Sequence, residues 1–257
     1  MKDVKWPDVV DSGHKLYFSA ISPKGSALLA SGKGVEAKLD GKTDWMYANE
    51  VSVDSKEKVK LSFHHTQVLC KLYVHAEDST AYRDWGAMKS IELDGVQYKD
   101  EASLDLPYDL LTVTFGTSPE FTLSGKKAAL PLYGLTNKVP EGYEDTAAGG
   151  FVIPVDKEKS AGYVLIPTSN VTPATGADYT TLNQIRFKLT SDNYDDANTD
   201  KEQKAREALI DLSKAQNNQG GSAIYIRLTL QAKGRIQFDS TSIDGWGDVE
   251  DVPGTVG

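Results

Sequence analysis

The sequence is poor in the features that mark most enzymes, membrane-spanning proteins and nucleic-acid-binding proteins. Cys70 is the single cysteine among 257 residues, which excludes an internal disulfide and a cysteine metal cluster. No apolar run approaches the roughly 18 residues that a membrane-spanning helix needs. Lysine and arginine total 28 against 37 aspartates and glutamates, giving a formal net charge of −9 without any basic cluster. We therefore expect no transmembrane segment in this chain and no nucleic-acid partner.

Motifs for catalysis and for cofactor binding are missing as well. The four histidines do not stand in the His-Glu-x-x-His spacing of a zinc enzyme. Adjacent strand residues face opposite ways, so His64 and His65 cannot both bind one metal ion. There is no Gly-x-Ser-x-Gly elbow and no glycine-rich phosphate loop. We predict a protein that is not an enzyme and binds no cofactor, in which Cys70 is a buried structural thiol.

The residues that are present predict a mainly β protein of one or two domains. Hydrophobic residues make up 39% of the chain, enough for a globular core. Apolar and polar residues alternate in short segments separated by turn residues about ten positions apart, which is typical of antiparallel β-sandwiches. The alternation changes phase near residues 64–67 and predicts a bend or bulge there. Asp94-Gly95, between two apolar triplets, predicts a hairpin turn.

One segment has helical spacing instead. A capping box at Thr199 and Glu202 precedes it, and Gly220-Gly221 follows it. The sequence therefore predicts one amphipathic helix near residues 200–216, inserted between strands. The apolar positions that carry this prediction are Ala205, Ala208, Leu209, Leu212 and Ala215.

The acidic stretch before this segment allows a calcium alternative. In an EF-hand register, Lys201 stands where the loop requires glycine, and the predicted helix would begin inside the loop. We therefore favour a solvent-exposed turn whose carboxylates lie near a helix N-terminus. The calcium ligands of the alternative would be Asp196, Asn198, Asp200, Glu202 and Glu207.

Several stretches, taken in order, carry a family resemblance over roughly residues 6–170. The segment from Val59 to His65, with its apolar continuation over 67–72, is the most telling of them. The others are Trp6-Pro7 before residues 16–23, Asp44-Trp45-Met46-Tyr47-Ala48, Trp85-Gly86 before residues 91–93, and Val164-Leu165-Ile166-Pro167. Together they resemble the fimbrillin family of Bacteroidales, the pilus subunits of the bacterial surface.

The resemblance implies a structural role. Fimbrillins are built from transthyretin-like β-sandwiches, are exported as lipoproteins of the outer membrane, and polymerise by strand exchange. We therefore expect a subunit of a surface fimbria that binds other fimbrial subunits, supports cell adhesion, and has a host or bacterial surface receptor as a possible partner. The alternative is a surface glycan-binding β-sandwich lipoprotein, in which tryptophan and tyrosine side chains stack on sugar rings.

The resemblance also implies a domain arrangement. The Trp-Pro signature follows several strands in the family, but here it begins at residue 6. Residues 1–55 would then be the incomplete remainder of an N-terminal sandwich with exposed strand edges, and residues 56–257 a C-terminal sandwich. The export signal, which this chain does not carry, is expected to be removed or missing. The candidate subunit-contact residues lie in the C-terminal segment, as a donor strand or an ordinary edge strand: Ile243, Trp246, Val249 and Val252.

Overall fold

The chain is described by a computed structural model in which β-strands dominate. It describes residues 15–23, 27–53, 59–99, 101–116, 119–135, 150–155, 160–168, 182–197, 204–214 and 220–246. Within these ranges the helices are α1 (Ser79–Trp85) and the short 3₁₀ helix η1 (Ala232–Gly234). All the strand pairs are antiparallel except β6 with β14, so the mainly β, antiparallel sandwich class predicted from the sequence is confirmed.

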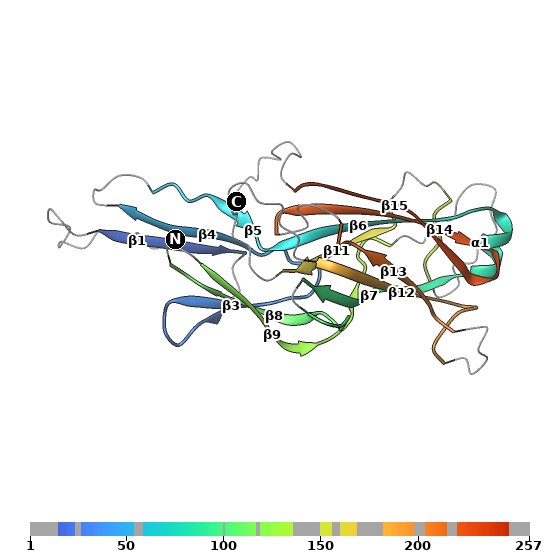
Figure 1. Cartoon of the computed structure of the whole chain (residues 1–257), viewed down its shortest axis with the longest axis horizontal. Coiled ribbons are helices and arrows are strands. Elements are labelled where there is room, and N and C mark those ends of the chain that lie inside the picture. The colour runs from blue at the N-terminus through green and yellow to red at the C-terminus, as the bar shows by residue number, and fades with distance from the viewer. Residues whose placement is uncertain are drawn as a thin grey trace.

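Two four-stranded sheets form the larger of two sandwiches (Figure 1). The β6 sheet has the order β11 (Gly162–Pro167), β6 (Gln67–Ala76), β14 (Ser222–Gln231) and β15 (Arg235–Gly245). The β7 sheet has the order β10 (Leu130–Pro131), β7 (Met88–Tyr98), β12 (Leu182–Ser191) and β13 (Arg206–Asp211).

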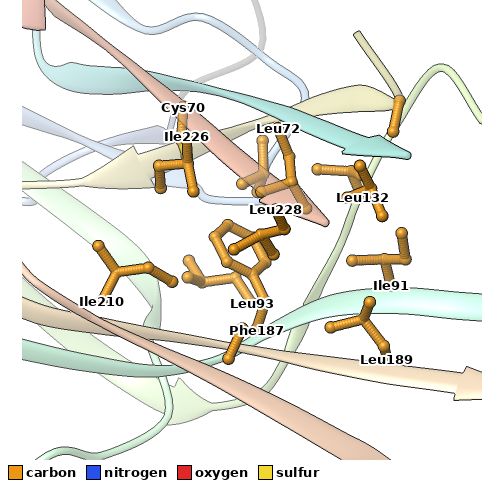
Figure 2. Packing of buried hydrophobic residues seen from close by; sticks show 14 of the residues in the cluster. Cys70, Leu72, Ile91, Leu93, Leu132, Phe187, Leu189, Ile210, Ile226 and Leu228 are labelled. Carbon is orange, nitrogen blue, oxygen red and sulfur yellow. The ribbon is translucent and has the colours of Figure 1, made fainter. Parts of the chain in front are cut away.

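Alternating side chains of these strands fill the space between the two sheets. On β6, Cys70 and Leu72 are fully buried, and they face the side chains of the β7 sheet such as Phe187 (Figure 2). Among the described residues, 32 buried residues form this large core. The predicted burial of Cys70 is confirmed, and this burial raises the pKa of its thiol.

The smaller sandwich lies at the other end of the molecule (Figure 1). Its β4 sheet has the order β1 (Leu16–Ser22), β4 (Met46–Val53) and β5 (Phe63–His65). Its β8 sheet has the order β2 (Ala27–Leu28), β3 (Gly34–Lys38), β8 (Tyr108–Thr114) and β9 (Glu120–Lys127). The small core contains eight buried residues: Val35, Ala37, Leu39, Trp45, Tyr47, Leu111, Val113 and Phe121.

The bend predicted near residues 64–67 joins the two sandwiches. β5 ends at His65 in the β4 sheet, and β6 begins at Gln67 in the β6 sheet. Thr66, between them, is fully buried, and its hydroxyl donates to the carbonyl oxygen of Trp45 at 2.7 Å. The side-chain oxygen of Gln67 accepts from the Trp45 N–H at 2.9 Å. The Thr66 hydroxyl and the Gln67 side-chain oxygen thus both bind the Trp45 backbone, which ties the bend to the start of β4.

Strand pairing crosses the domain boundary that the resemblance suggests at residue 55. β3 lies before that position and pairs with β8, which comes after it, from Gly34↔Thr114 to Lys38↔Leu110. β4 likewise pairs with β5. Residues 1–14 lie outside the described ranges, and the assignment of 1–55 to a remainder of a domain stays a prediction.

The helix predicted near residues 200–216 is wrong where the structure describes that segment. Residues 206–211 form strand β13, which pairs with β12. The buried side chains are Ala208, Ile210 and Leu212, which have the two-residue period of a strand, whereas Leu209 is 56% exposed. Ile210 fits this period and falls outside the helical set, so pairing with β12 and burial in the large core selected the strand.

The hairpin predicted at Asp94-Gly95 is also wrong. β7 runs through both residues as one strand, and the register with β12 shifts there, from Arg186↔Gly95 to Phe187↔Leu93. Asp94 is the extra residue of a β-bulge. Its carboxylate accepts from the guanidinium of Arg186 at 2.9 and 3.2 Å. The Asp94-Gly95 dipeptide, which often forms turns, is therefore part of a bulge here, and the bulge directs the Asp94 carboxylate toward Arg186 on β12.

Candidate subunit interface

The ladder between β4 and β5 stops before the end of β4, so part of this strand has no partner on one side among the described strands. Met46, Tyr47 and Ala48 of β4 pair with His65, His64 and Phe63 of β5. The same register would next place residue 49 opposite residue 62 and Glu50 opposite Leu61, but residues 59–62 form no ladder with β4. No described strand therefore pairs with residues 50–53 on the β5 side, and we call these residues the open edge.

The open edge continues an apolar face. Paired residues of an antiparallel ladder point to the same side of a sheet. Ile21 pairs with Tyr47, which is fully buried in the small core, but the register shifts between Phe18 and Ala20, where β4 has one residue more than β1. Leu16 and its partner Val53 therefore share the face of Ala20 and the fully buried Ala48, opposite to the face of Tyr47. Leu16, Val51 and Val53 are only half-buried. The face that carries Ala48 therefore extends as an apolar, half-covered surface beside backbone groups that no described strand pairs on the β5 side.

Large apolar side chains are exposed around the small sandwich. Leu28 on β2 is 78% exposed, Tyr17 on β1 is 61% exposed, and Phe63 on β5 is 44% exposed. Single exposed apolar residues are ordinary, but here three accompany an unpaired strand edge. Tyr17 and Leu28 lie within residues 1–55, and the assignment of that stretch to an incomplete domain stays a prediction.

The candidate contact residues Ile243 and Trp246 are engaged within the chain's own fold. Ile243 pairs with Ile224 in β15 and packs against the large core. The Trp246 ring stacks on the His65 ring with centroids 3.9 Å apart and an interplanar angle of 14°. The Trp246 N–H also donates to the carbonyl oxygen of Gly221 at 2.6 Å. Val249 and Val252 lie outside the described residues.

The stack on His65 places the end of β15 beside the bend between the two sandwiches. His65 Nδ1 lies 2.9 Å from one carboxylate oxygen of Asp44, which fixes the ring under the indole. Gly221, which holds the Trp246 backbone, donates its own N–H to the carbonyl oxygen of Gln67 at 3.0 Å. The chain after Trp246 therefore starts next to β5, the strand whose ladder with β4 stops early.

β15 is a long edge strand of the β6 sheet. Eight of its 11 residues are exposed, and it pairs with β14 on one side only. Its charged residues are Arg235, Asp239 and Asp244. Residues 235–245 thus form an ordinary edge strand, which is one of the two interpretations that the sequence allowed for this segment. A donor strand would have to come from residues beyond Trp246, or from β15 after it had separated from β14.

The five residues of the calcium alternative are not brought together in the described structure. Asp196 forms an ion pair with Lys188, and Glu207 lies 3.6 Å from Arg186 across the β7 sheet. Asn198, Asp200 and Glu202 lie outside the described residues. Among the described residues no three His, Cys, Asp or Glu side chains form a cluster that would hold a metal ion. The calcium alternative stays a prediction.

Two of the described tryptophans, Trp45 and Trp85, are buried and cannot serve in the sugar-binding platform of the glycan alternative. Trp85 is fully buried, and its indole N–H donates to the carbonyl oxygen of Gln231 at 3.0 Å. Trp45 is 5% exposed and belongs to the small core. Trp6 lies outside the described residues. In the described residues, therefore, Trp45 and Trp85 serve core packing, and a sugar would have to find other aromatic side chains.

Helix α1 was not predicted, although its sequence signals are present. The Asp78 carboxylate accepts from the Ala81 N–H at 2.8 Å as the N-cap, and Gly86 ends the helix at a φ of +66°. Ala81, Tyr82 and Trp85 are buried on one side. The helix closes one end of the large sandwich (Figure 1). No helix in the described ranges is long and apolar enough to cross a membrane.

Comparisons with known proteins return structural likenesses only. No family model matches the sequence, and no curated protein matches it. A candidate cell adhesion protein from Bacteroides uniformis is 18% identical, with a TM-score of 0.49 over 90% of this chain and 72% of that chain. One from Bacteroides ovatus is 11% identical, with a TM-score of 0.48 over 92% of this chain and 69% of that chain.

A third solved structure is a fimbrial protein from Bacteroides vulgatus. It is 13% identical, with a TM-score of 0.39 over 89% of this chain and 71% of that chain. Likenesses at these identities and TM-scores assign no function to this chain.

Proposed function

We propose that this chain is a structural subunit of a surface fimbria that polymerises by donor-strand exchange and supports cell adhesion. It acts without catalysis, and its partners are other fimbrial subunits and a receptor on a host or bacterial surface. Attachment to the outer membrane as a lipoprotein belongs to the same proposal. The function would then lie in backbone pairing and in the burial of apolar side chains between copies.

The observation that carries the proposal is the open edge of β4. Unpaired N–H and C=O groups along a strand form a template for a strand of another chain. Residues 50–53 present such groups next to half-buried Leu16, Val51 and Val53. A strand that paired there would gain backbone hydrogen bonds and would cover apolar side chains in one step. The stretches that resemble fimbrillins run through the same strands, at Asp44-Trp45-Met46-Tyr47-Ala48 and at 59–65.

The strand that fills this edge would come from the C-terminal segment of a neighbouring copy. Trp246 ends the described chain beside β5, and Val249 and Val252 follow it in the sequence. Carried between copies, the segment would pair with β4 in place of the missing continuation of β5. Ile243 and Trp246 would join that contact if the end of β15 separated from β14.

Disulfide trapping between two differently tagged copies tests the proposal. One copy carries Ser52→Cys, an exposed position on the open edge, and the other carries Val249→Cys. The native Cys70 is fully buried and its thiol pKa is raised, so it does not react under native conditions. We expect a cross-linked heterodimer under mild oxidation, and fibres of the unmodified chain by electron microscopy.

The matched control replaces Ser52→Cys by Lys33→Cys, an exposed turn position of the same sandwich. Equal cross-linking with both positions would mean random collision. A chain that stays monomeric at all concentrations, with no Ser52–Val249 product, would overturn the proposal.

A further inference from the structure

The outward face of the β6 sheet carries an unusual arrangement of tyrosines and cations. Lys71 and Tyr73 on β6 point away from the core, because their neighbours Cys70 and Leu72 point into it. Their partners across the ladder on β14 are Tyr225 and Arg227. In the first pair the cation is on β6 and the tyrosine on β14, and in the second pair the tyrosine is on β6 and the cation on β14. Each of the two strands therefore presents one tyrosine and one cation on this face. The neighbouring residue on β11 is Tyr163, which pairs with Lys71.

Each cation lies against a tyrosine ring. The Lys71 ammonium is 5.8 Å from the Tyr225 ring centroid, and the Arg227 guanidinium carbon is 4.8 Å from the Tyr73 centroid. The ring centroids of Tyr163 and Tyr133 are 6.1 Å apart. We call Tyr133, Tyr163, Lys71, Tyr73, Tyr225 and Arg227 the tyrosine–cation strip. Such contacts hold a cationic group in place while leaving its hydrogen-bond donors free.

The two central cations of the strip have no carboxylate partner among the residues that the structure describes. Among the described residues, no aspartate or glutamate forms an ion pair with Lys71 or Arg227. This is notable in a chain of net charge −9. The strip also continues at one end, where the Lys42 ammonium lies 5.6 Å from the Tyr133 ring centroid.

The carboxylates near the strip are already engaged. Asp239 accepts hydrogen bonds from Thr229 at 2.6 Å and from Gln237 at 2.9 Å. Glu77 accepts from Gln231 at 3.1 Å. Asp40 accepts from the Lys42 and Thr43 N–H groups at 2.8 and 2.6 Å. None of these contacts reaches Lys71 or Arg227, so the strip forms a locally positive surface on an acidic protein.

We propose that the tyrosine–cation strip binds an anionic polysaccharide that bears sugar carboxylates. A guanidinium held against a tyrosine ring presents its N–H groups to a planar carboxylate. Ser240 and Ser242 of β15 stand in the same rows as Arg227 and Tyr225, where their hydroxyls can bind sugar hydroxyls. The C–H faces of sugar rings pack on the half-buried tyrosines.

The geometry favours a polysaccharide over an acidic polypeptide. Added peptide strands pair with a sheet edge, and helices need an apolar groove. The strip instead lies on the face of the sheet, across the two inner strands β6 and β14 and their neighbour β11 (Figure 1). Neighbouring strands stand about 4.8 Å apart, so the strip spans a distance that suits consecutive sugar units.

The site is independent of polymerisation. It lies on the large sandwich, whereas the open edge of β4 lies in the small one. A chain that binds no polysaccharide can still form fibres, and a chain that forms no fibres can still bind polysaccharide. The experiments can therefore contradict polysaccharide binding without contradicting fibre formation, and the reverse.

Calorimetric titration of the full chain with oligogalacturonate tests the proposal. We expect saturable binding that weakens as salt rises, and no binding of a neutral glucan of equal length. The double variant Lys71→Gln with Arg227→Gln should lose about tenfold or more in affinity, because it removes two charge-assisted contacts. Arg227→Lys keeps the charge but loses the planar fork, so its affinity should fall between those of the wild type and the double variant.

Two comparisons separate this site from charge in general. The control variant Lys33→Gln with Arg83→Gln removes the same charge from exposed positions away from the strip and should bind like the wild type. Circular dichroism and thermal unfolding show that each variant is folded. Absence of binding by the wild type, or equal loss in both double variants, would overturn the proposal. Equal binding of polyglutamate of matched charge would also overturn it in favour of an acidic polypeptide.

Discussion

The two sandwiches of this protein are built by the same alternation of side chains but differ in how completely they close. The large one packs two four-stranded sheets around 32 buried residues. The small one packs a three-stranded and a four-stranded sheet around eight buried residues, and two of its strands have only two and three residues. The large core is therefore the more extensive of the two, and in the small sandwich no described strand pairs with residues 50–53 on the β5 side.

This difference indicates where stability and assembly are located. Burial of apolar surface is the main driving force of folding, so most of the stability should come from the large core. A small core beside an unpaired edge gains more from an added strand, because both apolar area and backbone groups are still available there. Under the proposed function, the small sandwich is therefore the part that would receive a strand of another copy.

The largest expected effect comes from emptying the large core. Phe187 is fully buried between the two sheets, and Phe187→Ala should cost about 3–5 kcal/mol of the free energy of unfolding. Phe121 in the small core is 5% exposed and contacts the Tyr47 ring edge-on at 4.8 Å. Phe121→Ala should lower the free energy of unfolding by less, because the small core has fewer buried side chains around the cavity that the substitution would leave. Urea unfolding followed by circular dichroism measures both, and equal losses would contradict the comparison.

A smaller effect is expected at the bulge that replaces the predicted hairpin. The Asp94 side chain is 12% exposed, and its carboxylate receives two hydrogen bonds from Arg186. Asp94→Ala should therefore cost about 1–2 kcal/mol of the free energy of unfolding, since it leaves the guanidinium without that partner. Lys127→Ala, which breaks the exposed pair with Asp105, serves as the control and should have much less effect. A loss at Asp94 no larger than at Lys127 would mean that the bulge ion pair does not stabilise the large sandwich.

The smallest expected effect concerns the turn between β3 and β4, which connects the two sheets of the small sandwich. Burial raises the pKa of Asp40, but hydrogen bonds from Thr43 and Lys42 outweigh it and hold the pKa below its usual value. The carboxylate therefore stabilises the fold above the ordinary aspartate pKa of about 4, and this contribution is lost as pH falls through the lowered value. Thermal unfolding between pH 6 and 3 should show a steeper decline, on the order of a few degrees, for the wild type than for Asp40→Asn. Parallel curves would contradict this role.

The sequence predicted the class of fold because strand alternation is a local signal. The burial of Cys70 and the bend at Thr66 followed from the same alternation. Asp94-Gly95 misled because the same dipeptide suits a turn and a bulge, and only pairing with β12 decides between them. Residues 206–211 misled because Ala208 and Leu212 fit both periods, and the burial of Ile210 becomes visible only in the packed sheet.

Neither surface site could be predicted from local patterns. The open edge depends on where the ladder of β4 and β5 stops, and residues 59–63 alternate like a strand whether or not they pair. The tyrosine–cation strip depends on the parallel register that sets Lys71 beside Tyr225 and Tyr73 beside Arg227. These partners are far apart in the chain, so only the folded structure brings them together.

Hydrogen–deuterium exchange tests the central claim that the small sandwich receives a strand from another copy. The measurement compares the dilute monomer with the concentrated chain, residue by residue in β4. We predict that amides of residues 50–53 exchange rapidly in the monomer and at least about tenfold more slowly after assembly, while the large core stays equally protected in both. Unchanged exchange at residues 50–53 would contradict the account.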